Sequence, residues 1–293
     1  MPKTAIITDS CSGITQQQAK ELGIQVVPMP FTINKKEYFE DINLTQDAFY
    51  EMLGQGAEVA TSQPSLGTLA SIFDETLKSY DEIVYLPMSS GLSGAYQSAK
   101  MLSEDYDEQV YVVNNQRISA TLEQDVYDAI EYVRQGKSAR EIKQLLEDNR
   151  FNCTIYITVD TLEYLKKGGR ITPAVAAIGS LLKIKPILNI YGEKLDKFAI
   201  ARTLNKAESI MIDAIAHDIE TRIDIEGKGD NVYLCIAHTN CPEVAEKLKK
   251  KMEKRWPGHE VRIVPLALAI ACHTGPGAIG AGCIKKVFNK KDA

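Results

Sequence analysis

Polar, glycine-rich segments occur at four places in the sequence, and three of them directly follow an apolar run. They are residues 8–12 (TDSCS), 61–65 (TSQPS), 89–95 (SSGLSGA) and 272–277 (CHTGPG). Hydroxyls, backbone N–H groups and an imidazole all donate hydrogen bonds, so together these segments suit the binding of an anion. The sequence has no Walker motif, no GxGxxG after a strand, and no pair of carboxylates placed for acid–base catalysis.

Each segment also has a purely structural interpretation. Asp9 or Ser10 can cap a helix after the first strand, and the hydroxyls at 61 and 62 can cap the helix that begins near Pro64. His273 lies between an apolar run and a glycine-proline turn, where a histidine is most often a satisfied core residue. Taken together with the hydroxyl segments, His273 is instead one more donor to an anion.

A serine hydrolase is the main alternative, because residues 91–95 nearly match the nucleophile elbow GxSxG. In that enzyme Ser93 is the nucleophile and His273 the base, and it acts on acyl esters. The spacing argues against it. Pro87 ends the preceding strand, so the chain reaches Ser93 through a loop that is too slack to strain a nucleophile.

The elements that must position these segments alternate between short β-branched runs and amphipathic helices in the first half of the chain. Strands are predicted at 4–8, 83–86 and 110–113, with strand material at 26–27 and 31–33. Helices are predicted after Pro64, after Gly94, around 122–133 and around 142–146. This alternation predicts an α/β fold whose N-terminal domain has a mainly parallel sheet with helices on both faces.

The second half is less regular and is predicted to form a smaller C-terminal α/β domain. Its strands are expected at 152–159, 187–190, 232–237 and 261–265, with a helix at 242–255. Residues 172–182 are apolar on nearly every side, which is typical of a helix that is buried or packed around something apolar. A boundary near Asn149 divides the chain into domains 1–149 and 150–293.

Composition narrows the function classes. The formal net charge of −5 leaves no overall basic field for nucleic acid, and membrane contact is expected to be transient at most. The local basic cluster at 247–255 is interpreted as a solvated helix face. Six cysteines without a CxxC pair, no signal peptide and no membrane-length apolar run together predict a cytoplasmic protein. Cys235, His238 and Cys241 have no second ligand pair, so no metal site is expected.

Five motifs in matching order resemble the DegV family, which includes the fatty-acid-binding subunits of bacterial fatty acid kinase. The five motifs are 7–10 (ITDS), 61–65 (TSQPS), 89–94 (SSGLSG), 165–171 (LKKGGRI) and 273–277 (HTGPG). Two shorter segments, 26–28 (VVP) and 184–187 (IKPI), also match the family. The resemblance covers almost the whole chain, and it implies a two-domain α/β fold with a long-chain fatty acid buried between the domains.

The resemblance also implies roles for particular residues. The fatty acid carboxylate would meet the residues that match the family motifs, namely Thr61, Ser62, Ser93, His273, Thr274 and Gly275. A partner kinase would phosphorylate this carboxylate to an acyl-phosphate, and Arg170 would assist docking and phosphoryl transfer. The chain itself would be no enzyme and need no cofactor. A purely structural protein, the third hypothesis, would contain no extractable lipid.

Overall fold

The computed structural model describes residues 2–178, 184–227 and 229–288, which form two compact units. The first unit comprises Met1–Arg150 with Ala267–Ala269, and the second comprises Phe151–Leu266 with Ile270–Ala293. The chain thus passes to the second unit one residue after the predicted Asn149 boundary. The short return at Ala267–Ala269 is a feature that a single boundary does not describe.

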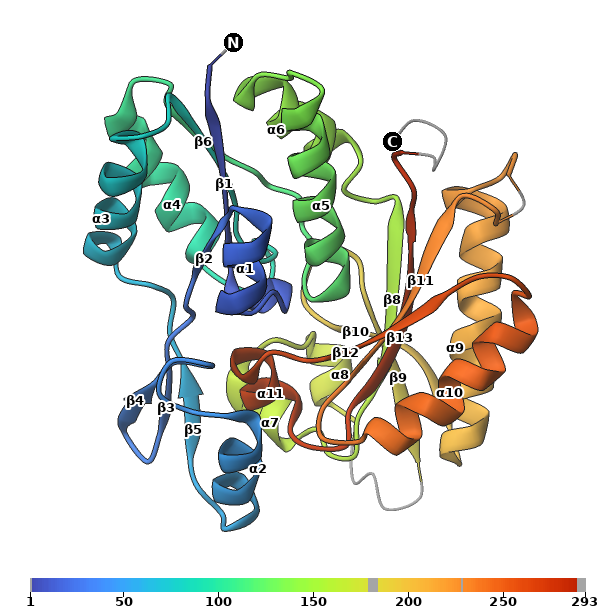
Figure 1. Ribbon diagram of the computed structural model, residues 1–293. Helices are drawn as coiled ribbons and strands as arrows, with labels where there is room; N and C mark the ends of the chain where they lie inside the picture. Colours follow the sequence, from blue (N-terminus) through green and yellow to red (C-terminus); the bar gives the residue numbers. More distant parts are fainter. Residues whose placement is uncertain (1, 179–183, 228, 289–293) are drawn as a thin grey trace. The chain divides into compact units, whose positions relative to one another are not determined.

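The first unit is built on a four-stranded sheet in the order β2-β1-β6-β7, with every neighbouring pair parallel. Its strands are β1 (Thr4–Asp9), β2 (Gln25–Val27), β6 (Glu82–Leu86) and β7 (Val110–Val112). Its helices are α1 (Gln16–Leu22), α3 (Leu66–Leu77), α4 (Ala95–Ser103), α5 (Ala120–Arg134) and α6 (Ala139–Asp148). Helices α3 and α4 lie on one side of the sheet and α5 and α6 on the other (Figure 1), which confirms the predicted parallel architecture.

Local sequence explains why α3 begins and packs as it does. Ser65 caps the helix, because its hydroxyl accepts a hydrogen bond from Thr68 N at 3.0 Å. Leu69 and Phe73 follow at the four-residue spacing of one helical face, and both are buried against β1 and β6. Phe73 meets Tyr85 of β6 edge to face, with ring centroids 5.7 Å apart.

A second, antiparallel sheet in the first unit was not predicted beyond its first strand. It has the order β4-β3-β5, formed by β3 (Phe31–Ile33), β4 (Lys36–Tyr38) and β5 (Val59–Thr61), and α2 (Gln46–Gly54) lies between β4 and β5 in the chain. Thr61, the last residue of β5, pairs with Phe31. One of the proposed binding segments therefore starts at the end of a strand.

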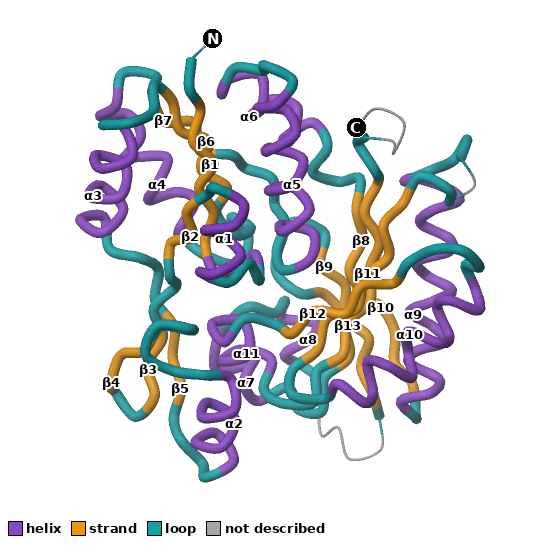
Figure 2. Tube along the Cα trace, viewed as in Figure 1, coloured by secondary structure: helices purple, strands orange, loops and turns teal. Residues whose placement is uncertain are grey.

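The second unit contains a six-stranded mixed sheet in the order β10-β9-β8-β13-β11-β12, and it confirms the predicted α/β class. Its strands are β8 (Cys153–Thr158), β9 (Lys185–Ile190), β10 (Asp196–Ala201), β11 (Val232–His238), β12 (Val261–Pro265) and β13 (Ile279–Lys285). Its helices are α7 (Glu163–Gly168), α8 (Pro173–Ala176), α9 (Leu204–Asp218), α10 (Pro242–Arg255) and α11 (Leu268–Thr274). Helices α9 and α10 run along the sheet (Figure 2) and share one buried core with it.

The long apolar stretch at 172–182 is described only in part. Thr172 caps α8, which is four residues long, and Val175 is fully buried. Residues 179–183 lie outside the described part of the chain. In the part that is described, no helix has both the length and the apolar character that crossing a membrane requires.

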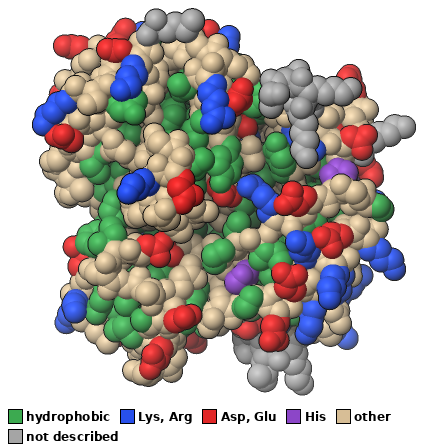
Figure 3. Space-filling view, in the orientation of Figure 1, with side chains coloured by type: hydrophobic (Ala, Val, Ile, Leu, Met, Phe, Trp, Pro, Cys, Tyr) green, Lys and Arg blue, Asp and Glu red, His purple; other side chains and the backbone are tan. Residues whose placement is uncertain are grey.

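Basic side chains gather over α10 (Figure 3), where the sequence shows its lysine-rich cluster. Three of them pair with carboxylates: Lys249 with Glu253, Lys251 with Glu208, and Arg255 with Glu220. The apolar residues Leu248 and Met252 are fully buried on the opposite side of the helix. This arrangement matches the interpretation of the cluster as a solvated helix face.

Candidate functional site

The first polar segment, at the carboxyl end of β1, is used to build the local structure. The Asp9 carboxylate is completely buried, and its Oδ1 accepts a hydrogen bond from Cys11 N at 2.9 Å. Ser10 Oγ accepts from Met29 N at 3.0 Å, and Ser12 Oγ donates to Asp9 O at 2.8 Å. The structure therefore favours the capping interpretation for this segment over direct contact with a ligand.

The serine-rich turn after β6 is fixed at its start by two hydrogen bonds. Met88 N donates to Asp9 Oδ2 at 2.7 Å, and Ser89 N donates to Arg117 O at 2.8 Å. The Ser89 carbonyl then accepts from Leu92 N at 3.0 Å and from Ser93 N at 3.1 Å, which closes the turn. Ser93 is thereby held in place by backbone contacts before α4 begins at Ala95.

The three hydroxyls of this turn differ in what they can offer a ligand. Ser89 Oγ is buried and accepts from Gly91 N, and Ser90 Oγ donates to Asn114 Oδ1 at 2.9 Å. Ser93 Oγ is half-buried and accepts from Ala95 N at 3.2 Å, and no described group accepts its hydrogen. Of these hydroxyls, Ser93 is therefore the one poised to donate to an anion.

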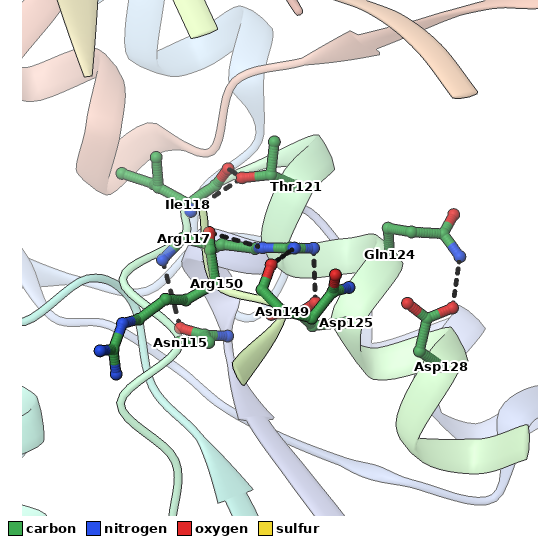
Figure 4. Close-up of polar contacts among 9 residues, drawn as sticks. All are labelled: Asn115, Arg117, Ile118, Thr121, Gln124, Asp125, Asp128, Asn149 and Arg150. Atoms are coloured by element: carbon green, nitrogen blue, oxygen red, sulfur yellow. Dashed lines mark hydrogen bonds and ion pairs between the residues drawn. The ribbon is translucent and has the colours of Figure 1, made fainter. Parts of the chain in front are cut away.

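Arg117, whose carbonyl accepts the hydrogen bond from Ser89 N, is itself fixed by a buried network of polar contacts (Figure 4). The guanidinium donates to Asp125 Oδ1 and to Asn149 O, both at 2.6 Å, and both side chains of the ion pair are fully buried. Asp128 lies one turn further along α5 and accepts from Gln124 Nε2 at 2.9 Å. Burial raises the pKa of Asp128 to about 6 and also raises that of Asp125, where the Arg117 cation opposes the shift.

The segment at 61–65 lies beside the serine turn in the first unit. Gln63 Nε2 donates to Ser98 Oγ of α4 at 2.6 Å, and the Gln63 amide occupies the space that a Cβ on Gly94 would fill. Gly94 directly follows Ser93, so Gln63 ties the two segments together. Ser62 has an exposed side chain, and its backbone N donates to Pro30 O at 3.1 Å. Thr61 is half-buried at the end of β5.

In the second unit, the paired glycines Gly168 and Gly169 form the C-terminal end of α7. Gly169 has a φ of 68°, the left-handed conformation of a helix C-cap, and its N–H donates hydrogen bonds to Leu165 O and Lys166 O. Arg170 is half-buried, and its guanidinium donates to Gly168 O, while its carbonyl accepts from Leu195 N at 2.9 Å. Arg170 thus has a defined place in the fold.

His273, near the end of α11, packs directly on this glycine turn. Its imidazole occupies the position that a Cβ on Gly168 would take, so only glycine fits beneath it. Burial, and to a smaller extent the Arg170 cation, lowers the pKa of His273 to about 4. The imidazole is therefore neutral at pH 7 and has one N–H to donate.

The two residues after His273 are already engaged within the fold. The buried Thr274 Oγ1 donates to Ile270 O at 3.3 Å, and Gly275 N donates to Ala271 O at 2.8 Å. Gly275 has a φ of 69°, and the ring of Tyr164 occupies the space above its Cα. Gly275 is thus required for a close approach and a left-handed turn.

The hydrolase alternative gains no support from this geometry. Ser93 lacks the positive φ that would mark a strained elbow, and its turn is held by ordinary backbone hydrogen bonds. None of the comparisons below points to ester hydrolysis.

Metal binding gains no support either. Cys241 N donates to His238 Nδ1 at 3.4 Å, and burial raises the pKa of the Cys241 thiol to about 11. Across the described residues, no group of three or more His, Cys, Asp or Glu side chains is arranged to hold a metal ion.

Comparison with known proteins gives a consistent family relationship. The family model described as "Uncharacterised protein, DegV family" matches residues 3–286. A DegV domain-containing protein of Staphylococcus aureus is 32% identical over 286 residues, covering 98% of this chain and 100% of the relative. Protein DegV of Bacillus subtilis is 32% identical over 281 residues, covering 94% of this chain and 97% of the relative.

Two solved structures are similar over nearly the full length. The first is described as fatty acid binding of a DegV family protein from Thermus thermophilus, with a TM-score of 0.86 and 28% identity over 97% of this chain and 99% of the other. The second is described as DegV, a fatty acid binding protein from Bacillus subtilis, with a TM-score of 0.85 and 29% identity over 98% and 100%. The chain matches family, relatives and structures throughout its length, and it belongs to the DegV family.

Proposed function

We propose that this chain binds one long-chain fatty acid, buries its apolar tail, and holds its carboxylate with hydrogen-bond donors. The residues of the carboxylate site in this proposal are Thr61, Ser62, Ser93, His273, Thr274 and Gly275. The observation that carries the proposal concerns the Ser93 hydroxyl. Backbone hydrogen bonds fix the turn that contains Ser93, and the hydroxyl hydrogen is available to an acceptor. The fatty-acid-binding DegV structures from Thermus thermophilus and Bacillus subtilis support the same ligand class.

The donors differ in how they contribute. Ser93 and the neutral His273 supply hydrogen-bond donors without a formal charge, whereas Arg170 beside His273 is assigned to phosphoryl transfer and not to holding the carboxylate. Thr274 and Gly275 have their donors directed into the fold, so their contribution is to shape the turn that carries His273. Hydrogen bonds to a charged group contribute about 1.5–3 kcal/mol each, so two or three donors give a strong preference for carboxylate over ester.

A ligand series tests this proposal directly. Displacement of a fluorescent fatty acid should show that palmitate binds at least tenfold more tightly than methyl palmitate, because the ester has lost the charge that the donors recognise. Octanoate should also bind more weakly than palmitate, because it buries about eight fewer methylene groups at roughly 0.8 kcal/mol each. Equal affinity for palmitate and its methyl ester would contradict the proposed head-group site.

We further propose that the bound carboxylate is presented to a cytoplasmic partner kinase, which converts it to an acyl-phosphate. In this proposal the chain carries the substrate, performs no chemistry alone and requires no cofactor. Arg170 supports the proposal, since a guanidinium fixed beside His273 can stabilise the charge that grows on a transferring phosphoryl group. No disulfide joins any of the six cysteines, all of which lie in the described part of the chain, and this suits a reducing compartment.

Substitution of Arg170 distinguishes fatty acid binding from phosphoryl transfer to the bound carboxylate. Arg170→Ala should leave fatty acid occupancy, measured by mass spectrometry, nearly intact and should slow acyl-phosphate formation with a cognate kinase. Lys167→Ala is the matched control, because Lys167 is an exposed cation three residues away. Equal loss of occupancy and phosphorylation in Arg170→Ala would mean that Arg170 only supports the fold, and unchanged phosphorylation would remove it from the mechanism.

A further inference from the structure

The polar segment at the end of β1 has no part in the proposed function, yet it contains a buried carboxylate, Asp9, that accepts a hydrogen bond at each oxygen. Asp9 is 0% exposed, and its two oxygens accept hydrogen bonds from two segments far apart in the sequence. Oδ1 accepts from Cys11 N at 2.9 Å, and Oδ2 accepts from Met88 N at 2.7 Å. A carboxylate is suited to this place because it accepts at both oxygens without presenting a hydrogen to either N–H group.

The need for such a contact follows from the sequence of β6. The parallel pairing of β1 with β6 ends at Thr8 and Leu86, and the next residue, Pro87, has no N–H to continue it. The side chain of Asp9 therefore binds the first N–H beyond the proline, that of Met88. The hydrogen bond from Met88 N to Asp9 therefore connects the end of β1 to the loop that follows β6, beyond the last paired residues of the two strands.

A short series of hydrogen bonds connects this contact to Ser93. Met88 is held by Asp9, and the adjacent Ser89 is held by Arg117 O. The Ser89 carbonyl accepts from Ser93 N at 3.1 Å, and Ser93 Oγ then accepts from Ala95 N at 3.2 Å. The backbone of this turn is thus held by Asp9 at Met88 and by Arg117 at Ser89, and the turn in turn holds Ser93.

We propose that Asp9 is a positioning residue for carboxylate binding, which acts through Met88 and Ser89 to preorganise the Ser93 hydroxyl. This inference rests on the proposed function, and it adds a residue that does not touch the ligand. Burial raises the pKa of Asp9 to about 6, so at pH 7 and above the side chain is mainly the ionised, two-sided acceptor that the geometry requires. A neutral amide in its place would turn an N–H group toward one of the two donors.

A double-mutant cycle tests the inference. Ser93→Ala alone should weaken palmitate binding about tenfold or more, as expected for loss of one hydrogen bond to a charged group. Asp9→Asn alone should weaken binding by a similar factor. In the Asp9→Asn background, Ser93→Ala should cause little further loss, because the hydroxyl is no longer held in its binding orientation. Independent, multiplicative effects would overturn the inference.

The matched control is Asp224→Asn in the second unit. Asp224 is also buried, and its Oδ2 accepts from two backbone groups, Gly229 N and Asn231 N, both at 3.0 Å. Both Asn variants should lower thermal stability, and only Asp9→Asn should weaken binding when affinity is measured well below both melting temperatures. Equal affinities for the two variants would mean that Asp9 only supports the fold.

A second variant covers the case in which Asp9→Asn does not fold. Asp9→Ser removes the buried charge and retains a hydroxyl acceptor for Cys11 N, the capping contact, but it is too short to reach Met88. It should show the same loss of affinity and the same coupling to Ser93→Ala. If wild-type protein binds no fatty acid, the proposed function itself fails. If it binds, and Ser93→Ala weakens binding while neither Asp9 variant does, only the inference about Asp9 fails.

Discussion

The imidazole of His273 rests on the backbone of Gly168, in the space that any larger residue would fill with its Cβ. This packing joins two motifs of the second unit that are about a hundred residues apart in the sequence. It also places the Arg170 cation, which is bound to Gly168 O, within electrostatic range of the ring. The position of His273 therefore depends on one glycine.

Gly168→Ala should displace the imidazole and weaken fatty acid binding. Overpacking of this kind typically destabilises a protein by about 1–3 kcal/mol. Gly54→Ala is the control, because Gly54 is also the last residue of a helix but nothing lies within 4 Å of its Cβ position. That variant should be neutral or slightly stabilising by up to about 1 kcal/mol. Chemical denaturation and palmitate titration of both variants provide the comparison, and unaltered binding by Gly168→Ala would contradict the role given to His273.

The His273 imidazole should stay neutral down to about pH 5 in the ligand-free protein, because its pKa is lowered to about 4. Between that value and about 6.5 the unfolded chain binds more protons, so this group makes the fold less stable as the pH falls through the window. NMR titration of the ring should show a higher pKa in Arg170→Ala, and a higher pKa again with palmitate bound to the wild type. A pKa unaffected by both changes would place His273 away from the carboxylate.

Removing the charge of Asp128 should stabilise the protein at alkaline pH. The folded pKa of about 6 lies above the ordinary 3.8, so the stability that this group contributes is full below pH 3.8 and is lost as the pH rises through 6. Asp128→Asn should raise the free energy of unfolding at pH 8 by on the order of 1–3 kcal/mol and flatten its dependence on pH. Urea denaturation between pH 5 and 8 measures both quantities.

Asp125→Asn provides the contrast to that variant. It removes the carboxylate charge that pairs with the buried Arg117 guanidinium, and such losses cost about 3–5 kcal/mol. The two substitutions remove the same charge one helical turn apart, and they should have opposite effects at pH 8. If both destabilise the fold equally, the network in Figure 4 needs both charges, and the assignment of the single counter-charge to Asp125 is wrong.

Helix α10 has a clear period and was predictable from the sequence, whereas strand β13 is built on small residues and was not. The bounds of α10 follow from Pro242 and the spacing of Leu248 and Met252, and they agree with the structure. Strand β13 was missed although it lies at the centre of its sheet, because glycine alternates with small residues along it. The reason appears only in the fold, where a Cβ on Gly282 would overlap Thr154 O of the neighbouring strand. Helix α9 was also missed, although Ala207, Met211 and Ile215 repeat every four residues.

The candidate site, too, was predictable only in part. The four polar segments are visible in the sequence because hydroxyls and glycines cluster where strands and helices end. The hydrogen bonds that connect these segments are not visible in the sequence, because tertiary contacts have no sequence pattern. Gln63 lies between two hydroxyl residues and a proline, where no sequence pattern distinguishes it, yet its amide covers Gly94. Asp9 looked equally suited to capping or binding, and only the contact with Met88 N shows how it can serve the site indirectly.

The most direct test of fatty acid binding is mass spectrometry of the lipid extracted from protein purified without added ligand. The account predicts close to one long-chain fatty acid per chain in the wild type, and a clearly lower occupancy in Ser93→Ala. The same preparations should show no turnover of simple acyl esters. Wild-type protein that is folded and contains no extractable fatty acid, even after incubation with palmitate, would contradict the account, as would esterase activity that disappears in Ser93→Ala.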